Sequence, residues 1–250
     1  MKMNNNPQFF PWLLGFLDAE GSFITNLVPR INKQNLVTSY RILYRIQIGL
    51  NIKDKAILEL ISSKLPLARG KIYNYPEKEE SCLCFTSFES MNYLIDNVFS
   101  KYPLMTEYQL NRYEKLRQGL QSKMVRVDSI EEFNAIKTDI VTPNFNTSSS
   151  FFLDQWLVGF LNGEVCFTQF NGKAGNLKPK VSLEHTDEQA LIFFKSHLNL
   201  GPQVSQLKQR ANRKITYRID VTSVHDLSKI CSFLDKTDTL LGNKKDQYNV

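Results

Sequence analysis

The sequence predicts an α+β fold made of two pseudo-symmetric αββαββα subdomains, and three observations support this prediction. Residues 12–23, WLLGFLDAEGSF, are repeated with variation as residues 156–167, WLVGFLNGEVCF. Each copy is followed by paired segments rich in β-branched and aromatic residues, which are typical of antiparallel strands. Helix-like segments follow each strand pair in the same order in both halves. We therefore expect an N-terminal repeat at 1–120, a linker at 121–150 and a C-terminal repeat at 151–250.

Each motif copy reads as a short apolar helix with a glycine in its interior. Glycine costs about 1 kcal/mol relative to alanine there, so a packing reason is needed. Gly15 and Ala19 are four residues apart, as are Gly159 and Gly163, which gives each helix one face of small residues. Small faces let two backbones approach closely. The two motif helices are therefore predicted to pack against each other.

Each helix ends in a carboxylate, Glu20 or Glu164. The helix dipole places about half a negative charge at that end, which disfavours an acid. If the helices pack side by side, two carboxylates about 6 Å apart repel by roughly 3 kcal/mol at an effective dielectric constant of about 20. A divalent cation would relieve this conflict, and oxygen ligands suit Mg²⁺ or Ca²⁺. An acid following either helix alone would be an ordinary surface residue, but matched positions in a duplicated motif favour a metal site.

After the first motif, strands are expected at 22–31 and 36–51, with Ile46, Ile48 and Leu50 facing the core and Arg45 and Gln47 facing solvent. A helix at 54–65 should bury Ala56, Ile57, Leu60, Ile61 and Leu65. Strands at 70–75 and 81–86 and helices at 88–101 and 106–120 complete the first half.

The second half repeats this order. Strands are expected at 166–171 and 177–185, with Val181 and Leu183 inward and Lys180, Ser182 and Glu184 outward. Next come a helix at 187–198, strands at 201–209 and 213–222, and a helix at 223–234 with a capping box from Ser223. The intervening residues 121–150 have the polar composition of a linker, with a short helix at 129–137.

Basic side chains recur on the outward strand faces and their turns. Two such antiparallel sheets would form a saddle that fits the major groove of DNA, where Arg and Lys recognise guanine. A strand face exposed to solvent is also ordinarily polar, so each of these residues taken singly could be an ordinary surface residue. The candidate DNA-binding residues are Arg30, Arg41, Arg45, Lys71, Lys173, Lys178, Lys180, Lys208, Arg210, Arg213 and Arg218.

Composition restricts the function classes. The net charge of +6 suits a polyanionic partner but does not prove one. No apolar run is long enough to span a bilayer and no long basic amphipathic helix is evident, so we expect no membrane partner. Four cysteines, Cys82, Cys84, Cys166 and Cys231, lack paired zinc spacing and are expected to be buried, reduced thiols. Three separate histidines, His185, His197 and His225, are expected to be surface or core residues.

The motif residues resemble the signature of the LAGLIDADG homing endonucleases in their single-chain, two-motif form. Residues 13–21 align with the nine signature letters without a gap, and residues 157–165 align more loosely. Asn162, Gly163 and Val165 depart from the usual letters, whereas the carboxylate is kept. The resemblance implies metal coordination by Glu20 and Glu164, aided by the backbone carbonyls of Ala19 and Gly163, with Mg²⁺ as cofactor and Ca²⁺ or Mn²⁺ as substitutes.

The resemblance also implies other catalytic residues. The family places a glutamine or lysine on a strand near the reacting water, and Gln47 and Lys180 match this position when Asp54 is superposed on Asp187. It also places a lysine in a segment shaped like Pro-Leu-x-Thr-x-Lys, which Lys244 matches in the second half. Tyr108 stands at that position in the first half, so the two DNA strands should be nicked at unequal rates.

The predicted function is site-specific, metal-dependent hydrolysis of both strands of a long, asymmetric DNA target by a monomer. An intron RNA maturase and a cleavage-dead DNA-binding protein remain as alternatives, favoured by Val165 and Tyr108. The polar residues 1–6 lack a secretory or transit signal. The abundance of Asn, Lys, Ile, Phe and Tyr fits an AT-rich coding genome. Together with the resemblance it implies an organelle-encoded protein, in the mitochondrion in preference to the chloroplast, with intron RNA as a further partner.

Overall fold

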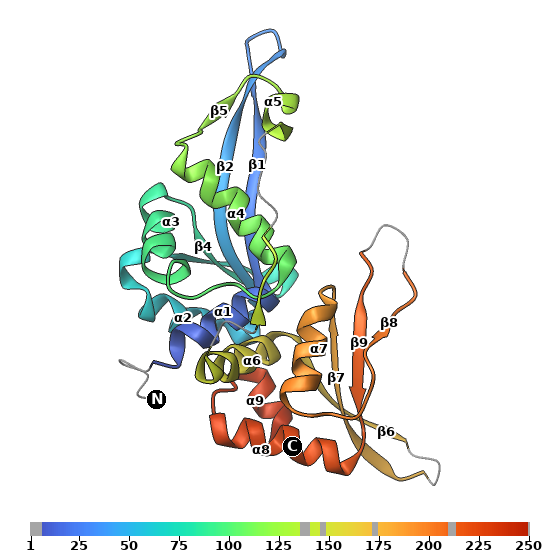
Figure 1. Ribbon diagram of the computed structural model, residues 1–250. Coiled ribbons are helices and arrows are strands. Elements are labelled where there is room, and N and C mark those ends of the chain that lie inside the picture. The colour runs from blue at the N-terminus through green and yellow to red at the C-terminus, as the bar shows by residue number, and fades with distance from the viewer. Residues whose placement is uncertain (1–6, 136–140, 146–148, 172–174, 210–213, 250) are drawn as a thin grey trace. The chain divides into compact units, whose positions relative to one another are not determined.

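A computed structural model describes residues 7–135, 141–145, 149–171, 175–209 and 214–249 (Figure 1). The chain divides into two compact units, Glu20–Pro143 and a second unit that joins Met1–Ala19 to Asn144–Val250. The first motif helix thus clusters with the C-terminal half, whereas the predicted repeats would place it with residues 1–120. The predicted boundaries of the two sequence repeats, 1–120 and 151–250, stay a prediction.

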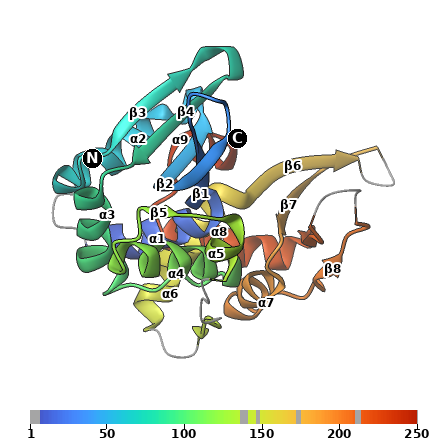
Figure 2. The same cartoon turned by 90° about the horizontal axis from the view of Figure 1, so that it is seen from above.

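The unit Glu20–Pro143 contains an antiparallel sheet in the order β1-β2-β4-β3, with a short fifth strand paired to β2. Figure 2 shows β3 and β4 running side by side as a two-stranded arm. The strands are β1 (Gly21–Ile31), β2 (Val37–Asn51), β3 (Lys71–Tyr75), β4 (Glu80–Phe85) and β5 (Arg126–Val127). The helices are α2 (Lys55–Lys64), α3 (Phe88–Leu94), which continues as a π-helical segment (Ile95–Phe99), α4 (Glu107–Gln121) and α5 (Ile130–Asn134).

The alternation predicted for β2 is confirmed. Tyr44, Ile46 and Ile48 are buried, while Arg45 and Gln47 lie on the opposite, more open face. Helix α4 lies along the buried face of β1 and β2, as Figure 1 shows. In the segment of α2, Ile57, Ile61 and Leu65 are buried as predicted and Leu60 is half-buried. The prediction was wrong for Ala56, which is exposed, and it missed Leu58, which is fully buried.

The segment predicted as a linker is partly built into this unit. Strand β5 pairs with β2, placing Val127 opposite Tyr40. The predicted short helix is α5, and Ser129 caps it by accepting a hydrogen bond from the Glu132 backbone N–H at 3.1 Å. Val127 and Phe133 are buried, so two apolar side chains in a polar stretch are sufficient to fix it to the sheet edge.

The second unit contains an antiparallel sheet in the order β6-β7-β9-β8. Its strands are β6 (Val165–Asn171), β7 (Leu177–His185), β8 (Ser205–Gln206) and β9 (Tyr217–Val221). Its helices are α6 (Ser150–Glu164), α7 (Glu188–His197), α8 (Val224–Thr237) and α9 (Gly242–Tyr248). It also contains α1 (Phe9–Glu20), except for the last residue of that helix, Glu20, which belongs to the first unit. The predicted α+β class and the helix and strand order are confirmed. Helix α9 was not predicted, because its short polar sequence has no apolar periodicity. The capping box of α8 is confirmed, since Ser223 Oγ accepts from the Asp226 backbone N–H at 3.1 Å.

The two motif helices, α1 and α6, pack backbone to backbone as predicted. A Cβ atom added at Gly15 would overlap the Trp156 carbonyl oxygen and lie 2.8 Å from the Phe160 nitrogen. A Cβ at Gly159 would overlap the Trp12 carbonyl oxygen in the same way. Each glycine therefore faces the other helix one turn before its carboxyl end, at the position where any side chain would hold the two helices apart.

Aromatic stacking around the glycines follows the same two-fold pattern. Trp12 stacks on Phe16 with ring centroids 5.0 Å apart, and Trp156 stacks on Phe160 at 5.1 Å. All four rings are buried. These large side chains supply the apolar area that a glycine-bearing helix cannot supply by itself.

The hydrogen bonds of the two tryptophans differ. Trp156 Nε1 donates to the fully buried carboxylate of Asp18 at 2.8 Å. Trp12 Nε1 is buried and finds no acceptor within the described residues. Asn162 stands where the second motif departs from Asp18, and its Oδ1 accepts from the Leu241 backbone N–H at 2.6 Å. The substitution of Asp by Asn is thus tied to the chain segment that leads into α9.

Replacing Gly15 by alanine should destabilise the protein by about 3 kcal/mol, because the new methyl group meets rigid backbone. Chemical denaturation would measure the loss. Gly49→Ala is the matched control, since its Cβ would meet only the mobile carboxylate of Glu80, at 2.9 Å. Equal stability of Gly15→Ala and Gly49→Ala would contradict the packing of α1 on α6.

The two indole groups should respond differently to the same change. Trp156→Phe removes a buried hydrogen bond to a carboxylate, which is worth about 1.5–3 kcal/mol. Trp12→Phe removes an N–H that has no acceptor in the described part of the chain. Denaturation curves should therefore show Trp156→Phe as the more destabilised variant, and the reverse order would refute the assigned hydrogen bonds.

Candidate functional site

Glu164 ends α6, and its side chain is 24% exposed. Glu20 ends α1 and is half-buried. It belongs to the unit Glu20–Pro143, whereas Glu164 belongs to the second unit. Both acids stand at a helix C-terminus directly before the first strand of a sheet. The helix dipole raises the energy of a carboxylate at this end, so each position favours a bound cation.

A histidine that the sequence did not single out lies beside Glu164. His185 Nε2 is 3.9 Å from Glu164 Oε1, and its Nδ1 accepts a hydrogen bond from the Asp187 backbone N–H at 3.0 Å. Burial lowers the pKa of His185, against the smaller opposing effect of Asp187. The imidazole is therefore neutral near pH 7 and adds no positive charge beside Glu164. His185, which was expected to be a surface or core residue, is half-buried beside Glu164.

Lys244 lies next to the chain segment that follows Glu164. Its Nζ donates to the Val165 carbonyl oxygen at 2.5 Å. Helix α9 carries Lys244, and the Leu241 to Asn162 hydrogen bond fixes the segment before it to α6. The structure thus brings a predicted catalytic lysine within one residue of a predicted metal-binding glutamate.

The other unit has a different residue in this role. Gln109 Nε2 donates to the Gly21 carbonyl oxygen at 2.6 Å, and Gly21 follows Glu20 as Val165 follows Glu164. Sequence comparison instead aligned Tyr108 with Lys244, one position away, and Tyr108 is exposed. The amide of Gln109 was missed because glutamine on a polar helix carries no signal. The first unit therefore has a neutral amide donor at the position where the second unit has the cationic Lys244.

The donor set fits a hard divalent cation. Carboxylate and backbone carbonyl oxygens are the ligands that Mg²⁺ and Ca²⁺ prefer. Gln109 Oε1 is buried with no partner in the described ranges, and its amide is bonded to the residue after Glu20. A metal-bound water would satisfy such an acceptor. Within the described residues no three His, Cys, Asp or Glu side chains cluster, so such an ion would draw its remaining ligands from carbonyls, water and a phosphate.

The strand registers place the predicted strand residues unequally. Gln47 lies opposite Ser22, two residues after Glu20. In the second unit the corresponding residue is Ser182, which lies opposite Cys166, two residues after Glu164. Lys180 lies two residues before Ser182 on the same strand, opposite Thr168. The register counterpart of Lys180 is therefore Arg45, opposite Ile24. Superposing the helices that follow the two strands does not give this correspondence. The number of residues between the strand position and the start of the helix differs between the two units.

Lys180 and Arg218 share one carboxylate on the outer face of the second sheet. Asp220 bonds Lys180 Nζ at 2.9 Å, Arg218 Nε at 2.8 Å and Ser182 Oγ at 2.7 Å. Burial tends to raise the pKa of Asp220, but these hydrogen bonds outweigh it and lower the pKa overall. Ser182 was expected to face solvent; it lies on the outer face, yet these side chains bury it.

The predicted DNA-binding residues lie where a nucleic acid can reach them. In the first unit Arg30, Arg41 and Lys71 are exposed, and Arg45 is half-buried. The strand register puts all four on the face opposite the buried Tyr44 and Ile46. In the second unit, the exposed Lys178 and Lys208 and the half-buried Lys180 and Arg218 are described, whereas Lys173, Arg210 and Arg213 lie outside the described residues.

Two cysteines lie on the polar face beside Gln47. Cys84 is opposite Gln47 in the register, and its Sγ is 3.4 Å from that of Cys82. The hydrogen bond from Cys82, with Arg45 in support, lowers the pKa of Cys84 to about 7, although burial opposes this. Both are free and buried as expected, but Cys166 and Cys231 are exposed, so that part of the prediction was wrong. Cys166 is exposed because it projects from the outer face of β6.

Comparison with known proteins identifies the repeated motif. Residues 13–119 match the family model described as LAGLIDADG endonuclease. This stretch, somewhat less than half of the chain, is therefore similar to the LAGLIDADG family. The match covers the first motif helix and the sheet that follows it, and it confirms the resemblance inferred from the two motif copies.

The whole chain has the fold of single-chain LAGLIDADG homing endonucleases. The structure of I-GzeII in complex with its DNA target has a TM-score of 0.73 at 22% identity, covering 95% of this chain and 87% of that one. I-SmaMI bound to uncleaved DNA in the presence of calcium ions has a TM-score of 0.72 at 20% identity, with 95% and 87% coverage. I-LtrWI bound to target DNA has a TM-score of 0.71 at 22% identity, with 97% and 87% coverage.

A curated relative comes from Saccharomyces cerevisiae. The uncharacterized mitochondrial protein RF1 is 27% identical over 173 residues, which is 67% of this chain and 33% of RF1. The chain thus matches about a third of the length of that relative. In the part of the chain that the structure describes, no helix has the length and apolarity needed to cross a membrane.

Proposed function

We propose that this LAGLIDADG chain is a site-specific homing endonuclease that hydrolyses both strands of a long, asymmetric DNA target. The observation that carries the proposal is the pair of glycine-packed helices, each ending in a half-buried carboxylate at the start of a sheet. The polar face of each sheet bears cations that suit a phosphate backbone. The family match and the DNA complexes of proteins with this fold support the same activity.

Glu20 and Glu164 would each hold a divalent cation, assisted by the carbonyl oxygens of Ala19 and Gly163. Bound Mg²⁺ supplies Lewis-acid activation of water and stabilisation of the leaving oxygen, and Ca²⁺ or Mn²⁺ can occupy the same oxygen ligands. Lys244, fixed by the Val165 carbonyl, places positive charge beside the scissile phosphate and stabilises the charge that develops there. In the first unit Gln47 and Gln109 offer only neutral hydrogen bonds.

The two sheets would bind different half-sites, because their outward side chains differ. Arg45 donates to Gln47 Oε1 at 3.2 Å, whereas its register counterpart Lys180 is paired with Asp220. One chain carries both motifs, so a monomer would suffice for both strands. Phosphate contacts would make the affinity strongly salt dependent. The mitochondrial yeast relative supports an organellar, mitochondrial location.

A maturase that binds intron RNA is the second candidate, and a cleavage-dead DNA-binding protein is the third. Both draw on the departure from the motif at Val165 and on the absence of a lysine at Tyr108. Retention of both glutamates favours the nuclease. The assay that follows separates all three.

Incubating the protein and Mg²⁺ with a plasmid that carries the uninterrupted host-gene sequence should yield one linear product. Glu20→Gln should reduce cleavage by at least roughly 100-fold, because it removes a charged metal ligand. Glu59→Gln, which makes the same change in an exposed ion pair with Lys55, is the control and should cut normally. RNA binding without cutting would favour the maturase, and DNA binding without cutting would favour the third candidate.

The two DNA strands should be nicked at different rates, with the slower nick in the half-site served by Glu20. Lys244→Met should slow the faster nick by roughly 100-fold, because a charged donor beside the phosphate is lost. Tyr108→Lys should leave the slower nick unchanged, since Gln109 and not Tyr108 bonds the Gly21 carbonyl. Strand-specific end labels would follow both nicks, and equal wild-type rates would reject this asymmetry.

A further inference from the structure

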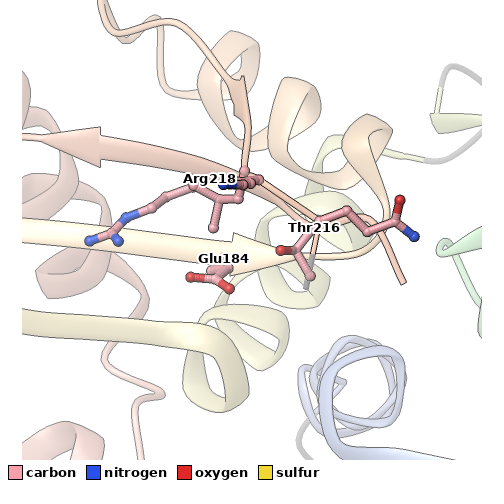
Figure 3. A pocket seen from close by; sticks show the side chains of 6 residues that line it. Glu184, Thr216 and Arg218 are labelled. Atoms are coloured by element: carbon pink, nitrogen blue, oxygen red, sulfur yellow. The ribbon is translucent and has the colours of Figure 1, made fainter. Parts of the chain in front are cut away.

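The outer face of the second sheet contains an open pocket of about 520 Å³, lined by Glu184, Leu207, Lys208, Gln209, Thr216 and Arg218. Figure 3 shows the side chains of Glu184, Thr216 and Arg218 turned toward this space. Among the lining residues that belong to the described part of the chain, only Leu207 is apolar. Pockets for small apolar ligands are lined mainly by hydrophobic side chains. This lining instead suits a polar, planar group presented from outside.

Glu184 differs from the other charged groups of this face. It lies directly opposite Arg218 in the strand register, yet Arg218 Nε bonds Asp220 at 2.8 Å. Lys180 is bonded to Asp220 as well. Within the described residues, the Glu184 carboxylate has no ion pair or hydrogen bond from a side chain. Asp220 therefore takes up Lys180 and Arg218, and Glu184 keeps its acceptor oxygens for a group from outside.

A carboxylate on a face that binds DNA repels phosphates unless cations of the face balance it, as they balance Asp220, or unless it accepts a hydrogen bond from a base. Guanine and thymine present acceptors in the major groove, and adenine presents an acceptor beside its amino group. Cytosine presents only the N4 amino donor. A carboxylate is therefore complementary to cytosine and mismatched to the other three bases.

The first unit has no equivalent side chain at this register position. The register counterpart of Glu184 is Gly49. Glu184 follows Leu183, which pairs with Val165. In the same way, Gly49 follows Ile48, which pairs with Gly21. A Cβ at Gly49 would lie 2.9 Å from Glu80 Oε1, so a carboxylate reaches this place from another strand. The two units thus present their acids differently, and the contact made by Glu184 belongs to one half-site.

We propose that Glu184 is a specificity-determining residue that recognises one cytosine of the DNA target through its N4 amino group. The inference rests on the proposed DNA-binding function and adds to it a base and a half-site. Arg218, held in place by Asp220 and Ser182, forms the wall of the pocket beside the recognised base pair.

The test is a selection of binding sequences from a randomised duplex library in Ca²⁺, with wild type, Glu184→Gln and Glu184→Ala. Wild type should select cytosine at one position, Glu184→Gln should select adenine there, because an amide matches the adenine edge, and Glu184→Ala should select no base. The preference should be roughly tenfold, which corresponds to one good base contact. Glu89→Gln, the same charge change in an exposed pair with Arg69, should leave all positions unchanged.

Identical selected sequences from wild type and Glu184→Gln would overturn the inference while leaving DNA binding intact. Absence of any selected sequence from wild type would instead overturn the proposed function. The wild-type protein alone gives a second measurement that needs no variant. Replacing the selected cytosine in a single duplex by each other base should weaken binding by about the same factor, and unchanged affinity would reject the assignment.

Discussion

The close contact between the backbones of α1 and α6 is the constraint on which the rest of this molecule depends. Gly15 and Gly159 each leave room for a carbonyl of the other helix, and the stacked tryptophan and phenylalanine rings enclose the contact. Glycine costs about 1 kcal/mol in each helix, and the buried aromatic area compensates for it. Because the helices meet through backbone, their carboxyl ends are fixed by a rigid surface and not by flexible side chains.

The residues that follow each helix determine what its terminal carboxylate can do. In the second unit, α9 returns to the end of α6, where Lys244 bonds the Val165 carbonyl and Leu241 bonds Asn162. In the first unit, α4 brings Gln109 to the Gly21 carbonyl. A charged donor thus holds the backbone after the terminal glutamate in one unit and a neutral amide holds it in the other, so the two units share this contact but differ in its charge.

Much of this was predictable from the sequence because local patterns and the structure agree. The small residues in the two motifs predicted the helix packing, and the alternation of β2 predicted its buried face. What failed depended on register or on contacts distant in sequence. Lys180 and Gln47 align through their following helices but not through their strands, and Gln109 sits one residue from the position that alignment favours. Helix α9 and strand β5 are held by contacts with residues distant in the sequence, such as Lys244 with Val165 and Val127 with Tyr40, for which short polar segments carry no periodic signal.

The unequal tryptophans have a consequence for how the two copies relate. Asp18 receives the indole of Trp156, but Asn162 has turned to the backbone of Leu241 and leaves the indole of Trp12 without an acceptor in the described residues. The copies are therefore no longer interchangeable. Two identical N-terminal repeats facing each other would pair both indoles with aspartates, whereas two C-terminal repeats would pair neither. Because one polypeptide carries both copies, neither copy has to be complementary to itself.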